Sequence, residues 1–393
     1  MTDMVFGAQD APEEEPILSH WWRTVDRWTL SAVAILFLVG LLLGLAASPP
    51  LAARNGLDPF HYVTRQAVFG VMGMGTMLVV SMMSPRQIRR WATLGFAGAF
   101  VAILLLPVLG TDFGKGAVRW YSLGFASVQP SEFLKPVFVV FAAWLMTGSM
   151  VRGGPPGKTL SFAVALAVTA CLALQPDFGQ ASLILAAWGL MYFVAGAPMP
   201  LLLGLAGAVV AAGTFAYENS EHFARRIDGY LTPNIDPNTQ IGYATAAIRE
   251  GGFLGVGIGE GQVKWRLPDA HTDFIIAVAA EEYGLLLVWI IIGLFGFVTL
   301  RALFRLSRER DPFIRLAGTG LAALFGMQAI INMGVAVRLL PAKGMTLPFV
   351  SYGGSSVVAA GIALGMLMAL TRRRPQDDFG DLVGISRDRA MSG

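Results

Sequence analysis

Long apolar runs separated by short polar segments dominate the chain. We interpret ten of these runs as helices that cross a membrane, because apolar segments of this kind match the thickness of a bilayer. Their approximate limits are 29–49, 66–84, 92–110, 131–147, 160–174, 178–196, 199–217, 273–299, 313–335 and 353–371. The pattern predicts an all-α polytopic membrane protein with one large loop, 218–272, between the seventh and eighth spans.

The composition agrees with this interpretation. Of the 393 residues, 55% are hydrophobic and only 14% are charged, whereas roughly a quarter of the residues in a soluble domain are charged. The net charge of +3 is small, and the pI of about 9.1 reflects arginines in loops, so no nucleic-acid partner is expected. Cys171 is the only cysteine, which excludes an intrachain disulfide.

An even number of spans places both termini on one side of the membrane. Most of the 29 lysines and arginines fall on that side, which predicts that it is cytoplasmic. We therefore predict a cytoplasmic tail (1–28), a membrane domain (29–371) with 218–272 on the periplasmic side, and a second cytoplasmic tail (372–393). The first tail lacks the basic region of a cleaved signal peptide, and its residues 17–28 suit a short interfacial helix.

The basic residues expected on the outer side are grouped. Those in the large loop are Arg225, Arg226, Arg249, Lys264 and Arg266, and the others include Lys115, Arg119, Arg338 and Lys343. Orientation rules disfavour basic residues there. An anionic substrate near the outer face would explain them, and so would anchoring to lipid headgroups; composition leaves both explanations open.

Two segments interrupt the apolar pattern at membrane depth. The segment 173–182 contains Gln-Pro-Asp-Phe-Gly with Asp177, and the segment 338–356 is rich in Pro and Gly and contains Ser351. Irregular backbone at this depth is tolerated where protein buries it or where it lines a wet cavity. We therefore expect both segments to line a cavity.

Carboxylates stand at the start of the eighth span and inside it. Glu281 lies about 12 Å along the helix axis from Asp273 and about 80° around it, whereas Glu282 is about 180° around. This geometry favours Glu281 as a cavity partner of Asp273 and predicts that Glu282 faces another helix. Asp273 itself fits either a general base or a cap of the helix N-terminus, and spacing leaves both open.

Further candidates are local pairs. Glu132 and Lys135 are three residues apart, so they can form an ion pair on one helix face. Arg119 could contact a phosphate and Trp120 a sugar or a lipid. Alternatively, the two residues anchor the chain at the membrane interface. The chain has no His-Glu-x-x-His or Cys-x-x-Cys motif, which argues against a dedicated zinc site. The sequence leaves open a divalent cation that bridges carboxylates and a diphosphate.

Five long segments carry a more specific signal. They are GAVRWYSLGFASVQPSEFLK, QPDFGQA, RIDGYLTPNIDP, GGFLGVGIGEGQVKWRLPDAHTDFIIAVAAEEYG and LLPAKGMTLPFVSYGGSS. Together, and in this order, they resemble the signature blocks of the SEDS family (shape, elongation, division and sporulation) over nearly all of 29–371. The last block, with its Lys and Thr-Leu-Pro, resembles the division-type members more than the elongation type. The family's Gly-Tyr-Gln block departs from the pattern, because it reads GYATAAI here (242–248).

The resemblance implies a peptidoglycan glycosyltransferase of the bacterial inner membrane with ten spans and cytoplasmic termini. Its substrate would be lipid II, polymerised into β-1,4 glycan strands at the periplasmic face of the division septum. A class B penicillin-binding transpeptidase and other division proteins would be its partners. The family's essential aspartate matches Asp273, an important glutamate matches Glu281, and a tryptophan matches Trp120.

The implied chemistry is an inverting displacement of undecaprenyl diphosphate by a GlcNAc 4-hydroxyl. It needs a base, for which Asp273 is the candidate, and groups that stabilise the leaving diphosphate. Glu281 would tune Asp273 or share a metal with it, although no cofactor is expected to be obligatory and Mg²⁺ or Mn²⁺ are the candidate ions. The candidate substrate contacts are Arg119, Trp120, Glu132, Lys135, Asp177, His271, Arg338, Lys343 and Ser351.

Two other functions remain as alternatives. Intramembrane charges and broken segments also suit a transporter that flips lipid II across the membrane, and a non-catalytic division scaffold is the third hypothesis. A transport path should show charge at the inner face as well. Asp273 and the outer basic residues instead gather at the outer face, which favours the enzyme.

Overall fold

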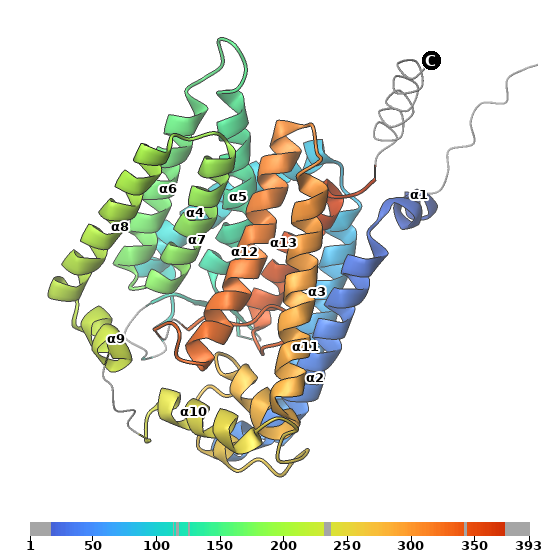
Figure 1. Ribbon diagram of the computed structural model, residues 1–393, viewed down its shortest axis with the longest axis vertical. Helices are drawn as coiled ribbons and strands as arrows, with labels where there is room; N and C mark the ends of the chain where they lie inside the picture. Colours follow the sequence, from blue (N-terminus) through green and yellow to red (C-terminus); the bar gives the residue numbers. More distant parts are fainter. Residues whose placement is uncertain are drawn as a thin grey trace, which may run out of the picture. The chain divides into compact units, whose positions relative to one another are not determined.

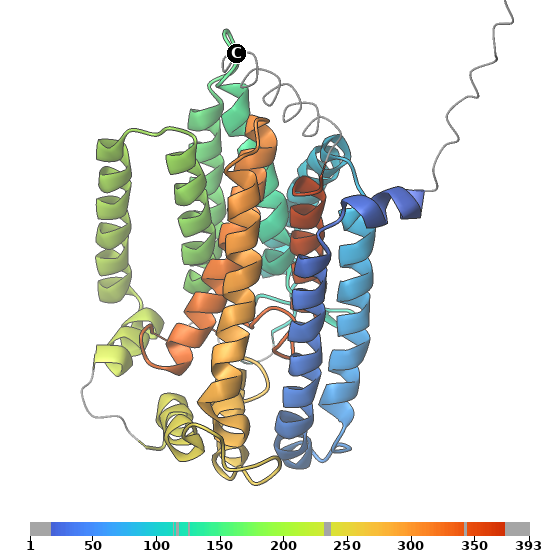
Figure 2. The ribbon, with the colours of Figure 1, turned by 45° about the vertical axis from the view of Figure 1, so that its right-hand side comes forward.

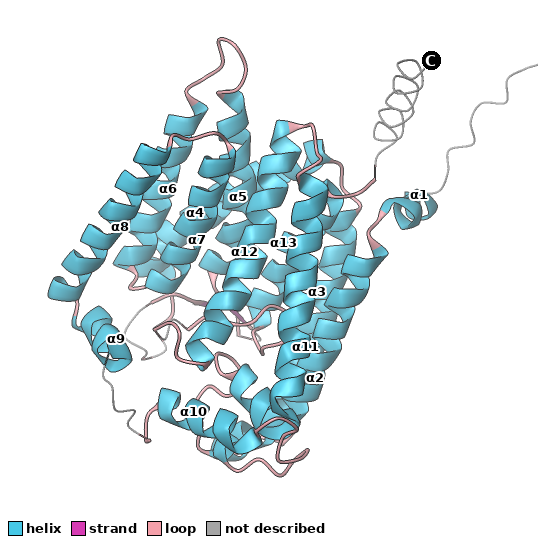
Figure 3. Ribbon diagram, viewed as in Figure 1, coloured by secondary structure: helices cyan, strands magenta, loops and turns pink. Residues whose placement is uncertain are grey.

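The computed structural model of the chain describes residues 17–112, 114, 118–124, 126–231, 237–341 and 344–373. Its elements are α1 (Ile17–Thr24), α2 (Arg27–Arg54), α3 (His61–Ser81), α4 (Pro85–Leu109), β1 (Tyr121–Ser122), β2 (Ser127–Val128), α5 (Pro130–Gly148), α6 (Gly157–Leu174), α7 (Phe178–Val194), α8 (Met199–Asn219), α9 (Glu221–Leu231), α10 (Gln240–Gly251), η1 (Val263–Trp265), α11 (Ile275–Leu306), α12 (Pro312–Ala336) and α13 (Gly354–Leu370). Helices dominate the described chain, and the only sheet within it is the short antiparallel pair β1–β2 (Figure 3).

Each of the ten apolar runs coincides with a helix, namely α2 to α8 and α11 to α13. Seven of the described helices are long and apolar enough to cross a membrane: α2, α3, α4, α5, α6, α11 and α12. The helices α7 and α13 are apolar but shorter. The predicted all-helical class with several candidate spans is therefore confirmed, while the number of crossings and the side of the termini stay predictions.

Local sequence signals set several helix starts. Ser84 and Gln87 form a reciprocal capping box at α4, with Pro85 in the first helical turn. Asp311 accepts hydrogen bonds from the backbone N–H groups of Phe313 and Ile314 at the start of α12. The helix predicted over 17–28 is shorter than expected: α1 ends at Thr24, and Arg27 already belongs to α2.

Residues 27–371 form one compact unit in which the long helices run side by side (Figures 1 and 2). The helix α12 packs against α5, α7, α11 and α13, and most of its residues are buried. The helices α3 and α13 approach closely because Gly361 has no side chain; a Cβ there would overlap the carbonyl oxygen of Gly73. The core of the unit therefore lies around α12 and α13.

The large loop between α8 and α11 is folded. It contains α9, α10 and η1, and α10 packs against α11 near one end of the bundle (Figure 1). The helix α11 breaks at Gly284, whose φ of 76° favours glycine. Beyond the break, the N–H groups of Leu285 and Leu286 donate to carbonyl oxygens of the loop, Gly252 and Phe253.

The loop also supplies hydrogen-bond donors to carbonyl groups at the end of the first part of α11, before the break. The N–H groups of Val256 and Gly257 donate to the carbonyl oxygens of Glu281 and Glu282, at 2.8 and 3.2 Å. Loop and broken helix thus exchange backbone hydrogen bonds in both directions, which meets the requirement that buried backbone groups be paired. This docking joins the two ends of the segment 257–281, which contains Asp273.

Candidate active site

The start of α11 and the segment between α12 and α13 meet at the same end of the unit. The amide nitrogen of Asn332, on α12, donates to the carbonyl oxygens of Asp273 (3.2 Å) and Met345 (2.5 Å). The Ser351 hydroxyl donates to the carbonyl oxygen of Thr272 at 2.6 Å. Two side chains therefore hold the chain at Asp273 against the segment that follows α12.

Asp273 is half-buried and borders a small pocket. The other lining residues are Ile331, Asn332, Val335, Gly344 and Met345. Phe274, the residue after Asp273, occupies the N-cap position of α11, and its side chain makes no cap hydrogen bond. The Asp273 carboxyl group is thus placed at a pocket rather than at the N-cap of the helix.

An aromatic cluster of Tyr62, His271 and Tyr352 adjoins this segment. The Tyr352 ring lies 5.4 Å from that of His271 and 5.7 Å from that of Tyr62 between centroids, and the Tyr352 N–H donates to the carbonyl oxygen of His271 at 2.9 Å. Burial raises the pKa of the Tyr352 phenol, although Arg65 acts in the opposite direction. Tyr352 therefore stays a neutral hydroxyl at physiological pH.

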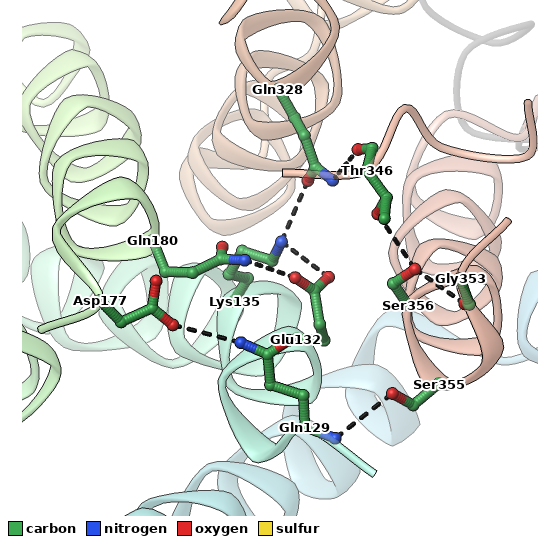
Figure 4. Close-up of polar contacts among 10 residues, drawn as sticks. All are labelled: Gln129, Glu132, Lys135, Asp177, Gln180, Gln328, Thr346, Gly353, Ser355 and Ser356. Carbon is green, nitrogen blue, oxygen red and sulfur yellow. Dashed lines mark hydrogen bonds and ion pairs between the residues drawn. The ribbon is translucent and has the colours of Figure 1, made fainter. Parts of the chain in front are cut away.

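A buried polar network connects α5 with the same segment (Figure 4). The predicted pair of Glu132 and Lys135 is present, at 2.8 Å, and Gln180 donates to the other oxygen of Glu132. The Lys135 ammonium donates to the amide oxygen of Gln328 at 3.1 Å, and the Gln328 nitrogen donates to the carbonyl oxygen of Thr346 at 2.9 Å. The ion pair is thus linked through one amide to the backbone beside Met345.

Asp177 lies at the interruption between α6 and α7. Its carboxylate accepts a hydrogen bond from the Gln129 amide at 3.2 Å. Burial raises the pKa of Asp177, and the positive charge of Arg119 opposes that rise. Two N–H groups of Arg119 donate to the carbonyl oxygens of Gln175 and Pro176, at 2.9 and 2.7 Å. Arg119 therefore braces the interrupted segment.

Glu281 and Glu282 are both buried and bind the large loop between α8 and α11. The carboxylate of Glu281 accepts from the backbone N–H groups of Val263 (2.7 Å) and Lys264 (3.0 Å). Glu282 forms an ion pair with the Lys264 ammonium on η1. Glu281, expected as the cavity partner of Asp273, binds this same short helix and is not among the lining residues of the pocket at Asp273. We call Glu281, Glu282 and Lys264 the loop clamp. Among the described residues, no three His, Cys, Asp or Glu side chains lie together as a metal site would require.

The remaining candidates are Trp120, Arg338 and Lys343. Trp120 is half-buried, and its carbonyl oxygen accepts from the Thr111 N–H at 2.8 Å. Arg338 has a φ of 59° and donates to the carbonyl oxygen of Tyr230 at the end of α9, at 3.1 Å. Lys343 lies outside the described residues. Of the sequence candidates, Asp273, His271 and Ser351 meet in one place, and Glu132, Lys135 and Asp177 in a neighbouring network.

Sequence reasoning missed Asn332, Gln328 and the role of Lys264. Amides inside an apolar span are uncommon and usually find a polar partner, so Asn332 and Gln328 could have been singled out from the ninth apolar run. The pairing of Lys264 with Glu282 had no comparable signal, because it spans 18 positions and depends on how the loop folds back.

A model of the FtsW/RodA/SpoVE family, described as cell cycle proteins, matches residues 27–376. The chain belongs to this family. The probable peptidoglycan glycosyltransferase FtsW of Caulobacter vibrioides is 43% identical over 366 residues, which is 93% of this chain and 94% of that protein. The FtsW of Halorhodospira halophila, with the same description, is 36% identical and covers 94% of this chain and 95% of its own length. The expected resemblance to the SEDS family is confirmed.

Solved structures of the FtsW/RodA/SpoVE family share the fold. One comes from a study of how a peptidoglycan synthase complex coordinates polymerization and crosslinking; its TM-score is 0.73 at 27% identity, covering 88% of this chain and 97% of that one. The rod shape determining protein RodA of Thermus thermophilus has a TM-score of 0.65 at 26% identity, with 89% and 97% covered. Together with the apolar helices, family membership identifies the chain as a multi-pass membrane protein.

Proposed function

We propose that the chain is a peptidoglycan glycosyltransferase that polymerises lipid II into β-1,4 glycan strands during septal cell-wall synthesis. The observation that carries the proposal is Asp273, which borders a pocket and whose backbone is held by the side chains of Asn332 and Ser351. Relatives matched along nearly their whole length bear the name of this activity. A pocket with a carboxylate on a well-held backbone is what a proton-abstracting site needs.

The proposal includes a topology. Residues 29–371 form a ten-span domain of the bacterial inner membrane, and the tails 1–28 and 372–393 lie in the cytoplasm. The loop 218–272 and the pocket at Asp273 then face the periplasm at the septum. The excess of basic residues on the side of the termini supports this orientation.

The proposed reaction is one displacement. The oxygen of a GlcNAc 4-hydroxyl forms a bond to the anomeric carbon of the donor MurNAc, and its proton passes to the Asp273 carboxylate. The bond between that carbon and the diphosphate oxygen breaks, and its electron pair leaves with undecaprenyl diphosphate. An α-linked donor becomes a β-linked product, so one inverting step suffices. A positioned base of this kind typically supplies about 10²–10⁴ in rate.

The leaving diphosphate needs positive charge. Lys343 and Arg338 lie in the segment that follows α12, next to the pocket in sequence, and we assign them this role. Arg119 is assigned a supporting role, because two of its N–H groups already hold the interruption beside Asp177. The proposal requires no obligatory cofactor, and Mg²⁺ or Mn²⁺ would accompany the diphosphate.

The proposed partner is a class B penicillin-binding transpeptidase, which would crosslink the strands that this chain makes, together with other division proteins. A structural relative comes from a synthase complex in which polymerization and crosslinking are coordinated. The remaining substrate contacts proposed from the sequence are Trp120, Glu132, Lys135, His271 and Ser351.

A polymerisation assay tests the proposal. The purified chain, alone and with its transpeptidase, is given lipid II in detergent, where a flippase has no second compartment and yields no glycan. We expect glycan strands from the wild type and none from Asp273→Asn. Asp269→Asn is the matched control: it removes a carboxylate four residues away at a φ of 53°, a conformation that Asn tolerates, and should keep activity.

Two results would contradict the proposal. Glycan synthesis by Asp273→Asn at the wild-type rate would remove Asp273 as the base. Absence of glycan from a folded wild type with its partner present would favour the scaffold or the flippase instead.

A further inference from the structure

Asn332 sits at the candidate active site with one half of its amide unused. Its side chain is only 3% exposed and lines the pocket that Asp273 borders. Its nitrogen donates to two backbone carbonyl oxygens, those of Asp273 and Met345. Among the residues that the structure describes, its oxygen Oδ1 has no hydrogen-bond partner.

The orientation of this amide follows from its neighbours. An oxygen in place of the nitrogen would face two carbonyl oxygens, which only accept hydrogen bonds. The nitrogen therefore points at Asp273 and Met345, and Oδ1 is left as an acceptor. A buried acceptor without a donor costs about 1–3 kcal/mol, so its presence beside a catalytic carboxylate calls for an explanation.

Gln328 shows what a purely structural amide looks like on the same helix. It lies one turn before Asn332 and also binds the segment after α12, through Thr346. Its oxygen, however, accepts from the Lys135 ammonium, so both ends of this amide are used. Both amides thus hold the segment after α12. They differ in that the Gln328 oxygen has a donor, whereas Oδ1 of Asn332 has none among the described residues.

We infer that Oδ1 of Asn332 accepts a hydrogen bond from a hydroxyl of the acceptor sugar, and so aims its 4-hydroxyl at Asp273. This inference rests on the proposed function. The other pocket walls include Ile331, Val335 and Met345, an apolar lining that suits a neutral hydroxyl rather than a diphosphate. The hydroxyls nearest the GlcNAc 4-hydroxyl are those on C3 and C6, and Asn332 binds one of them.

A rate comparison with altered acceptors tests the inference. The full-length wild type, Asn332→Ala and Gln328→Ala are each given lipid II, or lipid II whose GlcNAc lacks the 3- or the 6-hydroxyl. Loss of one neutral hydrogen bond corresponds to about a five- to tenfold loss of rate. We expect the wild type to lose this factor on one of the two deoxy substrates. Asn332→Ala should show the same loss on natural lipid II, and it should lose no further rate on that deoxy substrate.

Gln328→Ala separates the binding of a sugar hydroxyl by Asn332 from the shared function of holding the segment after α12. It loosens the same segment, so we expect it to be slower on every substrate while still distinguishing natural from deoxy lipid II as the wild type does. Asn332→Ser, whose side chain is too short to replace Oδ1, takes the place of Asn332→Ala if the latter does not fold, with the same expected result.

The inference is overturned if Asn332→Ala discriminates against the deoxy substrates as strongly as the wild type, or if the wild type uses both at the natural rate. In these cases the wild type still makes glycan, and the proposed function stands. If the folded wild type makes no glycan from natural lipid II, the proposed function and the inference fail together.

Discussion

The loop clamp and the pocket at Asp273 both join α11 to other segments of the chain, and their carboxyl groups lie in different surroundings. In the clamp, Glu281 accepts two backbone N–H groups and Glu282 pairs with Lys264, so the charges are used to hold protein to protein. At the pocket, the backbone around Asp273 is held by Asn332, and the Asp273 carboxyl group borders the pocket. Burial of a carboxylate therefore does not by itself separate one that holds the loop from one that borders a pocket.

Glycines mark the clamp as the more tightly packed of the two regions. A Cβ on Gly255 would overlap the carbonyl oxygen of Glu282, and one on Gly251 would overlap that of Ala280. At the pocket, a Cβ on Gly344 would meet the Asp273 carboxylate only at an ordinary 3.6 Å. The clamp therefore tolerates no added atoms, whereas the pocket leaves room beside its carboxylate.

The largest effect is expected from removing the cation of the clamp. Lys264→Ala leaves the buried carboxylate of Glu282 without its partner, which costs about 3–5 kcal/mol. Thermal unfolding of the purified variant in detergent measures the loss. Arg266→Ala removes an exposed basic residue two positions away and should unfold at nearly the wild-type temperature. Equal unfolding temperatures for both variants would show that the clamp does not stabilise the loop.

A smaller effect is expected at the backbone contact of the clamp. Gly255 has a φ of 84° and touches α11, whereas Gly259 has a φ of 83° and nothing within 4 Å of its would-be Cβ. In both variants the left-handed backbone costs about 1–2 kcal/mol of folding free energy. Only Gly255→Ala must also displace α11. The unfolding temperature should fall further for Gly255→Ala. A larger fall for Gly259→Ala would contradict the close approach.

The smallest effect concerns Asp177, outside both regions. Its raised pKa means that the folded chain holds the proton more tightly than the unfolded chain does. Stability from this group is present below its unfolded pKa of about 4 and is lost as pH rises through the folded value. Asp177→Asn, which keeps an acceptor for Gln129, should gain in unfolding temperature over the wild type as pH rises from 4 to 8. A difference that shrinks over this range would contradict the stated direction.

The sequence predicts those features that depend on neighbours along the chain. The apolar runs gave the long helices, and the spacing of Glu132 and Lys135 gave an ion pair, because both follow from helix geometry. Helix geometry separated Glu281 from Glu282 around the axis, but both carboxylates bind the same loop segment, at Val263 and Lys264. It could not supply their partners, because the loop returns to α11 across the break at Gly284.

The candidate site was predictable in part for the same reason. Asp273, His271 and Ser351 stood out as polar residues at the ends of apolar runs, and the family resemblance singled out Asp273. Asn332 binds Asp273, which is 59 positions away in the sequence, and Met345, which is 13 positions away. Only the packing of the helices brings these residues together. Arg119 was expected to meet a phosphate, yet its N–H groups bind carbonyl oxygens of an interruption 56 positions away.

The central claim is that Asp273 performs chemistry while Glu281 holds the loop. Measuring lipid II polymerisation and the unfolding temperature together, for Asp273→Asn and Glu281→Gln, tests it most directly. We predict that Asp273→Asn abolishes glycan synthesis at an unchanged unfolding temperature. Glu281→Gln should lower the unfolding temperature, because an amide cannot accept both N–H groups through charged oxygens, while the rate per folded molecule persists. A stable but inactive Glu281→Gln, or an active Asp273→Asn, would contradict the account.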